Sequence, residues 1–265
     1  MYGVTRELAK APDTLDGWYA LHSLYRVDWP RWLALPDERR EAALAQASSR
    51  MGEEAALQER HLGDSGHYWV LGHKADLMLL HLRPTLDELA DVENAWAHLD
   101  LGDFLVPAYS YLSVVELSTH GGAPRGEEAQ EQAERALRAR LEPDLPASRY
   151  ACFYPMSKLR GEERNWYMLD AAARRDLMRS HGLIGRGYAG RVQQIITGSM
   201  GLDDWEWGVD LFSDDPLQFK KIIYEMRFDE VSAVYALFGS FFVGIRIDPG
   251  VLRRYLATER GGAQK

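Results

Sequence analysis

The sequence predicts an α+β protein made of two βαββαβ units lying side by side. Each half of the chain shows the order strand, helix, strand, strand, helix, strand. A local pattern recurs, because LMLLHLRPTLDEL (77–89) and VDLFSDDPLQF (209–219) are each an apolar strand, a proline and a helix start. Hydrophobic residues make up 46%, enough for a full core. Two such units would pack antiparallel sheets against helices.

The first unit is expected within residues 1–125. Aromatic and apolar runs alternate with stretches rich in Ala, Glu and Arg, which favour helices. Pro36 and Asp37 introduce one helix, and Pro84 and Thr85 introduce the other. Gly72 marks a turn between two strands. The expected strands are 17–29, 67–73, 75–83 and 104–118, and the expected helices are 36–60 and 86–100.

The second unit follows a linking segment. Gly121, Gly122 and Pro124 mark a boundary, and EEAQEQAERALRARL predicts a linking helix within 126–148. In the remaining unit, 149–265, one helix is expected to end at Gly182, a residue type common just past helix ends. The expected strands are 149–156, 191–200, 205–212 and 231–247, and the expected helices are 165–182 and 214–226.

Charge and cysteine content exclude several classes of protein. The net charge of −9 disfavours a nucleic-acid partner, since phosphate binding requires a basic face. Cys152 is the single cysteine, so no intramolecular disulfide can form. The first residues, MYGVTRELAKAPDTL, lack the apolar core of a signal peptide, and the apolar stretch 234–247 is too short to span a bilayer. A soluble cytoplasmic protein is expected.

Unusual residues gather in the second half. Tyr154 lies in CFYPMSKLR with Met156 and Lys158, and His181 is the only histidine after residue 120. Gln194 interrupts an apolar strand. Each residue taken singly also fits a structural role: a histidine near a helix end can stabilise the helix dipole, and a tyrosine in an aromatic strand can be a core residue. The same applies to a core Cys152, a solvent-facing Gln194, a packing Trp205 and a surface Lys158.

Taken together, these residues resemble a known family. The run Cys-Phe-Tyr-Pro-Met-Ser-Lys (152–158), with His181 placed 27 residues after Tyr154, resembles the coproheme decarboxylases of the chlorite dismutase superfamily. Similar segments extend over nearly the whole chain, including YSYLSVVELS and TGSMGLDDWEW. The resemblance implies two ferredoxin-like domains forming an α+β barrel, a homopentamer, and haem bound in the C-terminal domain.

The resemblance also implies a reaction. The substrate would be iron coproporphyrin III (coproheme) and the oxidant hydrogen peroxide. Two propionates would become vinyl groups with loss of carbon dioxide, giving haem b through a three-propionate intermediate. His181 would bind the iron, Tyr154 would be the redox-active tyrosine, and Lys158 would hold the reacting carboxylate and assist proton movement. Transient contact with coproporphyrin ferrochelatase would supply the substrate.

Further positions carry over from the same family. Arg140, Arg227 and Ser232 match propionate contacts, and Met156 and Trp205 match residues of the pocket wall. Chlorite dismutases have an arginine where this chain has Gln194. A neutral amide can orient peroxide but supplies no charge, so chlorite dismutation is not expected as the main activity.

Two other functions stay open from the sequence. One is a haem-binding relative of the same fold, peroxidase-like or haem-transferring, without decarboxylase activity. The pairing of Tyr154 with Lys158 argues against it. The other is a structural or regulatory ferredoxin-like oligomer without haem, in which each of the unusual residues would have only the structural role given above.

Overall fold

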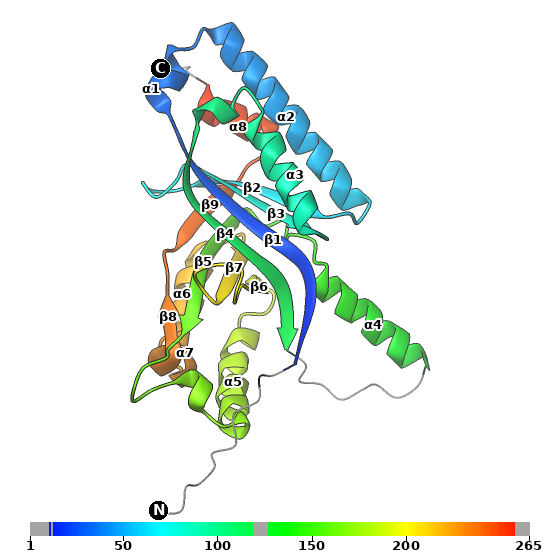
Figure 1. The fold of residues 1–265 in the computed structure, drawn as a ribbon, viewed down its shortest axis with the longest axis vertical. Coiled ribbons are helices and arrows are strands. Elements are labelled where there is room, and N and C mark those ends of the chain that lie inside the picture. The colour runs from blue at the N-terminus through cyan, green and yellow to red at the C-terminus, as the bar shows by residue number, and fades with distance from the viewer. Residues whose placement is uncertain (1–10, 12, 119–126, 258–265) are drawn as a thin grey trace, which may run out of the picture.

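The fold is organised around one antiparallel sheet whose strands come from both halves of the chain. The computed structural model describes residues 11, 13–118 and 127–257 (Figure 1). The strand order is β7-β6-β4-β1-β3-β2-β9-β5-β8, and β7 also pairs with β5, which closes a ring. The strands are β1 Thr14–Val27, β2 Asp64–Val70, β3 Leu77–Arg83, β4 Leu105–Ser118, β5 Tyr150–Lys158, β6 Gln193–Gly198, β7 Trp207–Ser213, β8 Ala236–Phe238 and β9 Phe242–Arg246. The predicted α+β class is confirmed.

The helices gather at opposite ends of this sheet. Those of the first half, joined by α8, lie at one end, and α5, α6 and α7 lie at the other, while α4 projects to the side (Figure 1). No helix in the described ranges is long and apolar enough to cross a membrane. The helices are α1 Trp29–Ala34, α2 Asp37–Glu59, α3 Leu86–Ala97, α4 Glu127–Leu141, α5 Ala171–Arg186, α6 Leu217–Met226, α7 Glu230–Tyr235 and α8 Pro249–Leu256, with short 3-10 turns at Gly102–Phe104 and Trp166–Met168.

The elements of the first half follow the sequence closely because local signals agree with packing. Thr85 and Glu88 form a capping box at the start of α3, each side chain bonding to the other's backbone N–H. Gly72 has a φ of 92°, a left-handed conformation that suits glycine in the turn between β2 and β3. The predicted division into 1–125, 126–148 and 149–265 stays a prediction, since strands from both halves pair within one sheet.

The predicted strand 231–247 is wrong. Its first residues form α7, and only short strands, β8 and β9, follow. Asp229 explains the difference, because its carboxylate accepts a hydrogen bond from the Ser232 N–H at 3.4 Å and caps a helix. An apolar run by itself does not distinguish a helix from a strand. The sequence analysis also missed α8, which Asp248 caps through the Val251 N–H at 2.8 Å.

The predicted helix 165–182 is shifted in the structure. Asp170 caps the start of α5 by accepting a hydrogen bond from the Ala173 N–H at 2.8 Å, and residues before it form a 3-10 turn. Gly182 does not end the helix, because it keeps a helical conformation and α5 continues to Arg186. His181 therefore lies inside α5, more than a turn before its end.

A buried polar pair lies inside the sheet ring. The imidazole Nε2 of His22 on β1 donates to both carboxylate oxygens of Asp210 on β7, at 2.9 and 3.1 Å. The His22 ring also stacks on Phe153, with 3.9 Å between ring centroids. Both side chains of the pair are shielded from solvent, and they connect the two halves of the chain across the core. Such a pair is costly to break because the remaining partner would be buried and unsatisfied.

Substituting His22→Ala should therefore lower the free energy of unfolding by about 3–5 kcal/mol, since Asp210 would keep a buried carboxylate without its partner. Urea unfolding would measure this loss. The double variant His22→Leu with Asp210→Leu should lose less, because it leaves no unsatisfied group. A loss below about 1 kcal/mol in the single variant would contradict this account of the pair.

Candidate functional site

Strand β5 separates the interior of the ring from an outer face covered by helices. Phe153 belongs to the cluster inside the ring, whereas Cys152 and Tyr154 belong to a cluster shared with β7 and α6. Side chains alternate along a strand, so Tyr154, Met156 and Lys158 project from the same outer face. The three residues singled out by the sequence run are thus aligned on one side of the sheet.

Tyr154 is held rigidly on this face. Its ring stacks on Phe241 with 4.5 Å between centroids, and it lies 5.9 Å from the ring of Phe238. The guanidinium of Arg227, at the end of α6, lies 3.7 Å from the centroid of Phe238. Burial raises the pKa of the Tyr154 phenol above its ordinary value, with a small opposing effect from Arg227. The phenol is therefore neutral near pH 7, and its oxidation must release a proton together with an electron.

His181 has one ring nitrogen occupied and the other available. Its Nδ1–H donates to Oδ2 of Asp229 at 2.8 Å, and the imidazole keeps 25% of its side chain exposed. Asp229 itself is buried at the start of α7. In a neutral imidazole, donation from Nδ1 leaves the Nε2 lone pair able to bind a metal. The donor set therefore fits a metal-ligating imidazole oriented by a carboxylate.

Lys158 is a buried cation close to the same carboxylate. Only 8% of the residue is exposed, and its Nζ lies 4.7 Å from the centroid of the Trp166 ring. Burial lowers the pKa of Lys158 to about 8, although the negative charges of Asp229 and Glu206 act to raise it. The negative charge of Asp229 therefore acts on Lys158 of β5, while its carboxylate bonds directly to the imidazole of α5.

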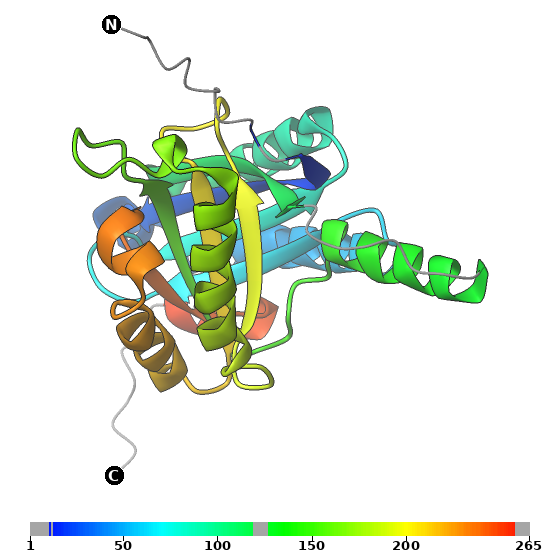
Figure 2. The same ribbon diagram turned by 90° about the horizontal axis from the view of Figure 1, so that it is seen from below.

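Helix α5 does not pack closely on the sheet. None of its residues is buried, although it contacts α6 and α7. On the outer face of the sheet, Ile196 of β6 pairs with Val209, which in turn pairs with Tyr154. Ile196 nevertheless remains 44% exposed, and Figure 2 shows β6 alongside α5. An apolar residue in the same pairing row as Tyr154 is therefore left uncovered.

The corresponding helix of the first half, α2, packs directly on the sheet. Helix α2 buries apolar residues and Glu54. The Glu54 carboxylate accepts hydrogen bonds from His67 Nε2 at 2.7 Å, Trp96 Nε1 at 2.8 Å and Arg50 Nε at 2.9 Å. Burial acts to raise the pKa of Glu54, but its hydrogen bonds and the neighbouring histidines lower it to about 2. Hydrogen bonds around the Glu54 carboxylate thus hold α2 against the sheet in the first half, whereas α5 buries no residue in the second.

Most predicted site residues come together around His181 and Tyr154. Ser232 is buried in the first turn of α7 beside Asp229. Gln194 is exposed on the outer face of β6, in the pairing row of Cys152. The group that the structure assembles consists of Tyr154, Met156, Lys158, His181, Arg227 and Ser232, with Gln194 on the same sheet face.

Two predicted residues have other surroundings. Trp205 precedes β7 and packs against the cluster inside the ring, and its Cζ2 lies 3.0 Å from the Cβ position of Gly239. Arg140 is exposed in the last turn of α4, which projects away from α5 (Figure 2). The folded chain alone therefore does not bring Arg140 to the site. Both residues were placed by similarity of position along the chain, which carries no information about the direction of a side chain.

Asp229, Trp166 and Glu206 are contacts that the sequence analysis missed. The backbone N–H of Lys158 donates to Glu206 Oε2 at 2.6 Å, which ties the end of β5 to the start of β7. The run FDEVSAV contains a helix-cap signal at Asp229, but predicting a strand over this segment concealed it. Trp166 and Glu206 carry no local signal, since their role arises only from contact with Lys158.

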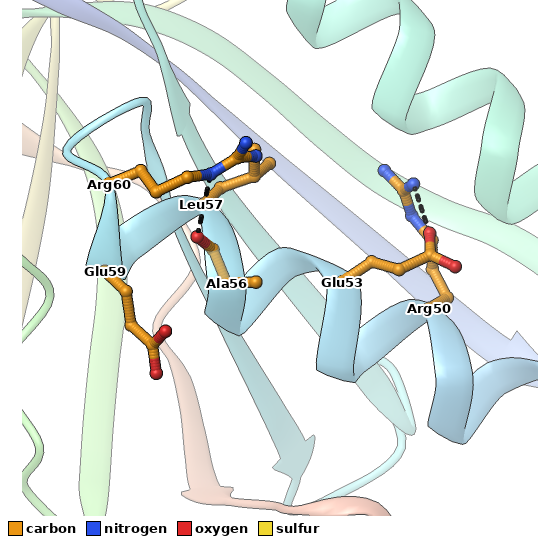
Figure 3. A pocket seen from close by; sticks show the side chains of 6 residues that line it. All are labelled: Arg50, Glu53, Ala56, Leu57, Glu59 and Arg60. Atoms are coloured by element: carbon orange, nitrogen blue, oxygen red, sulfur yellow. Dashed lines mark hydrogen bonds and ion pairs between the residues drawn. The ribbon is translucent and has the colours of Figure 1, made fainter.

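Two surface hollows occur elsewhere. One, of about 590 Å³, lies at the end of α2 and is lined by the side chains drawn in Figure 3. The other, of about 440 Å³, lies between α4 and β1. Neither contains a predicted site residue, and the first is lined by charges of both signs, including Arg50, Glu53 and Glu59. The candidate site is therefore defined by its side chains and by the exposed sheet face next to α5.

Comparison with known proteins agrees with this fold. Residues 40–247 match the family model described as chlorite dismutase. A solved structure described as a novel heme-binding protein from Thermus thermophilus is 47% identical, with a TM-score of 0.87 over 95% of this chain and 99% of that one. Chlorite dismutase from Candidatus Nitrospira defluvii in complex with imidazole is 20% identical, with a TM-score of 0.71 over 91% and 95%. The chain belongs to the chlorite dismutase family.

Proposed function

We propose that the protein is a coproheme decarboxylase, which uses hydrogen peroxide to convert iron coproporphyrin III into haem b. One observation carries this proposal: α5 buries none of its residues, it packs Ile184 against the cluster that contains Tyr154, and its His181 is oriented by Asp229. A flat macrocycle is the kind of ligand that fits between a helix and a sheet that are not packed together. The 47% identity to a heme-binding protein supports an iron porphyrin as that ligand.

Each residue of the group would have a distinct part in binding. His181 would coordinate iron through Nε2, while Asp229 fixes the ring orientation and increases its basicity. Ile196 and Met156 would contact the apolar macrocycle. Arg227 and Lys158 would bind propionates, because buried carboxylates need paired cations. Arg140 would take part only if α4 moved toward α5, or if the Arg140 of a neighbouring subunit reached the site.

The reaction balances with one peroxide for each propionate. A propionate, one hydrogen peroxide and one proton give a vinyl group, carbon dioxide and two water molecules. Hydrogen peroxide would be the oxidant, and the iron of the porphyrin would activate it. The Tyr154 phenol would give up an electron and its proton, then take a hydrogen atom from the propionate carbon next to the ring. Lys158 would hold the carboxylate until the carbon–carbon bond breaks, and it could supply the proton.

Gln194 supports this reaction over chlorite chemistry. It lies on the same face as Tyr154 and offers a neutral amide, so it can orient peroxide without stabilising an anion by charge. The proposal further includes a cytoplasmic homopentamer, two ferredoxin-like domains divided as in the sequence analysis, and transient contact with coproporphyrin ferrochelatase.

A haem-binding protein without decarboxylase activity is the second candidate, favoured by the description of the 47% identical relative. Adding iron coproporphyrin III and then peroxide, with mass spectrometry of the porphyrin, separates the two. Two successive losses, each of carbon dioxide and two hydrogens, support the decarboxylase. A porphyrin that binds but keeps its mass supports the second candidate.

Substituting Tyr154→Phe should leave coproheme binding nearly unchanged and reduce decarboxylation by at least about 100-fold, because the ring packing stays while the oxidisable phenol is lost. Binding would be followed by the Soret band and product by mass. Phe153→Tyr restores a phenol on the wrong face, so adding it should not restore activity. Rapid formation of haem b by Tyr154→Phe would refute the role of this tyrosine.

Substituting His181→Ala should weaken iron porphyrin binding and shift the Soret band, because the imidazole Nε2 is removed. Asp229→Asn is a matched variant that keeps the imidazole but weakens its hydrogen bond, so it should produce a smaller spectral change. Absorption titration would compare the two. Tight binding with an unaltered Soret band in His181→Ala would mean that another residue coordinates the iron.

The kcat/KM of decarboxylation should fall as the pH rises above about 8, because Lys158 then loses the proton that makes it a cation. Below this pH the ammonium group is charged and can hold a propionate. Lys158→Arg should remove this alkaline decrease, since a guanidinium stays charged, and Lys158→Met should lower kcat/KM at all pH values. An identical alkaline decrease in Lys158→Arg would assign it to another group.

A further inference from the structure

Helix α5 carries a row of arginines in a protein that is acidic overall. Arg175, Arg179 and Arg186 are exposed and recur at i, i+4 and i+11, which places them on one face of the helix. The net charge of the chain is −9, so this row is a local exception. Asp176 is the only acidic residue within α5, and its exposed ion pair with Arg179, at 3.4 Å, is of the weak surface kind.

The position of the row relates it to the candidate site. Leu177 and Ile184 form the face of α5 that packs on neighbouring clusters, and the arginines lie on the other side. They are roughly 120–160° around the helix from His181, at about 100° per residue. Arg186 folds back toward the turn that carries His181, since its Nη1 lies 3.5 Å from the Cβ position of Gly182. The row therefore lies on the side of α5 that faces away from His181, outside the site itself.

We propose that Arg175, Arg179 and Arg186 form a capture surface that selects porphyrins by their number of free carboxylates. This inference rests on the proposed function. The substrate carries up to four carboxylates and the product two, so the row attracts the substrate more strongly. A patch of one sign can raise association rates by about 10-fold or more at low ionic strength. The acidic remainder of the chain repels both porphyrins, which makes the local patch decisive for the path of approach.

The capture surface also has a consequence for product release. A dicarboxylate that leaves the site is drawn back less strongly than a tetracarboxylate substrate is drawn in. Substrate can therefore compete effectively with product for the same site even though both share the macrocycle. The arginines act on the rate of approach, and the residues that contact the bound porphyrin determine how long it stays.

The test compares two triple variants that remove the same charge. One is Arg175→Gln, Arg179→Gln, Arg186→Gln. The control is Arg39→Gln, Arg60→Gln, Arg254→Gln, on exposed positions of α2, its C-terminal cap and α8, at the opposite end of the molecule (Figure 1). Stopped-flow Soret changes give the association rates of iron coproporphyrin III and of haem b, at about 0.01 M and about 1 M ionic strength, where charges act over roughly 30 and 3 Å.

The α5 variant should bind iron coproporphyrin III ~10-fold more slowly at low ionic strength, with a smaller effect on haem b, and the difference should vanish at high ionic strength. Its dissociation rate should not change. Equal association rates for the α5 variant and the unaltered protein, or an equal decrease in the control, would overturn the inference. If the unaltered protein formed no Soret complex with either porphyrin, the proposed function itself would fail, which is a distinct result.

Discussion

The hydrogen bond between His181 and Asp229 is the interaction on which the candidate site depends. One carboxylate caps α7, receives the imidazole Nδ1–H of α5 at 2.8 Å, and supports the charge of Lys158 on β5. A single buried group thereby joins α5 to the start of α7 and acts on β5 through its charge. Because Asp229 is shielded from water, its interactions are stronger than those of a surface carboxylate. The orientation of His181 follows from this arrangement and does not require a bound ligand.

The two halves of the chain use the same order of elements in opposite ways. In the first half, Glu54 receives hydrogen bonds from α2, β2 and α3, and the helix packs on the sheet. In the second half, α5 buries no residue and leaves Ile196 exposed. One half therefore contributes stability, while the other accepts exposed apolar surface next to His181. This difference between the two halves favours a ligand site in the second half alone.

The sequence was most reliable where local signals and packing agree. The helix start at Thr85, the turn at Gly72 and the strand that carries Tyr154 all appear where the sequence predicts them. It failed at 231–247, where an apolar run hid the helix cap at Asp229, and at Gly182, because glycine ends a helix only when the backbone turns there.

The α+β class could be predicted from the sequence, because the alternation of strand and helix patterns is a local property that can be read without coordinates. Tyr154, Met156, Lys158 and His181 were singled out by the resemblance of their sequence run to a known family. The folded structure was needed to show that Asp229 orients His181, that α5 buries none of its residues, and that Arg140 lies on the projecting helix α4. These features depend on contacts between residues far apart in the chain, and such contacts leave no pattern in either segment alone.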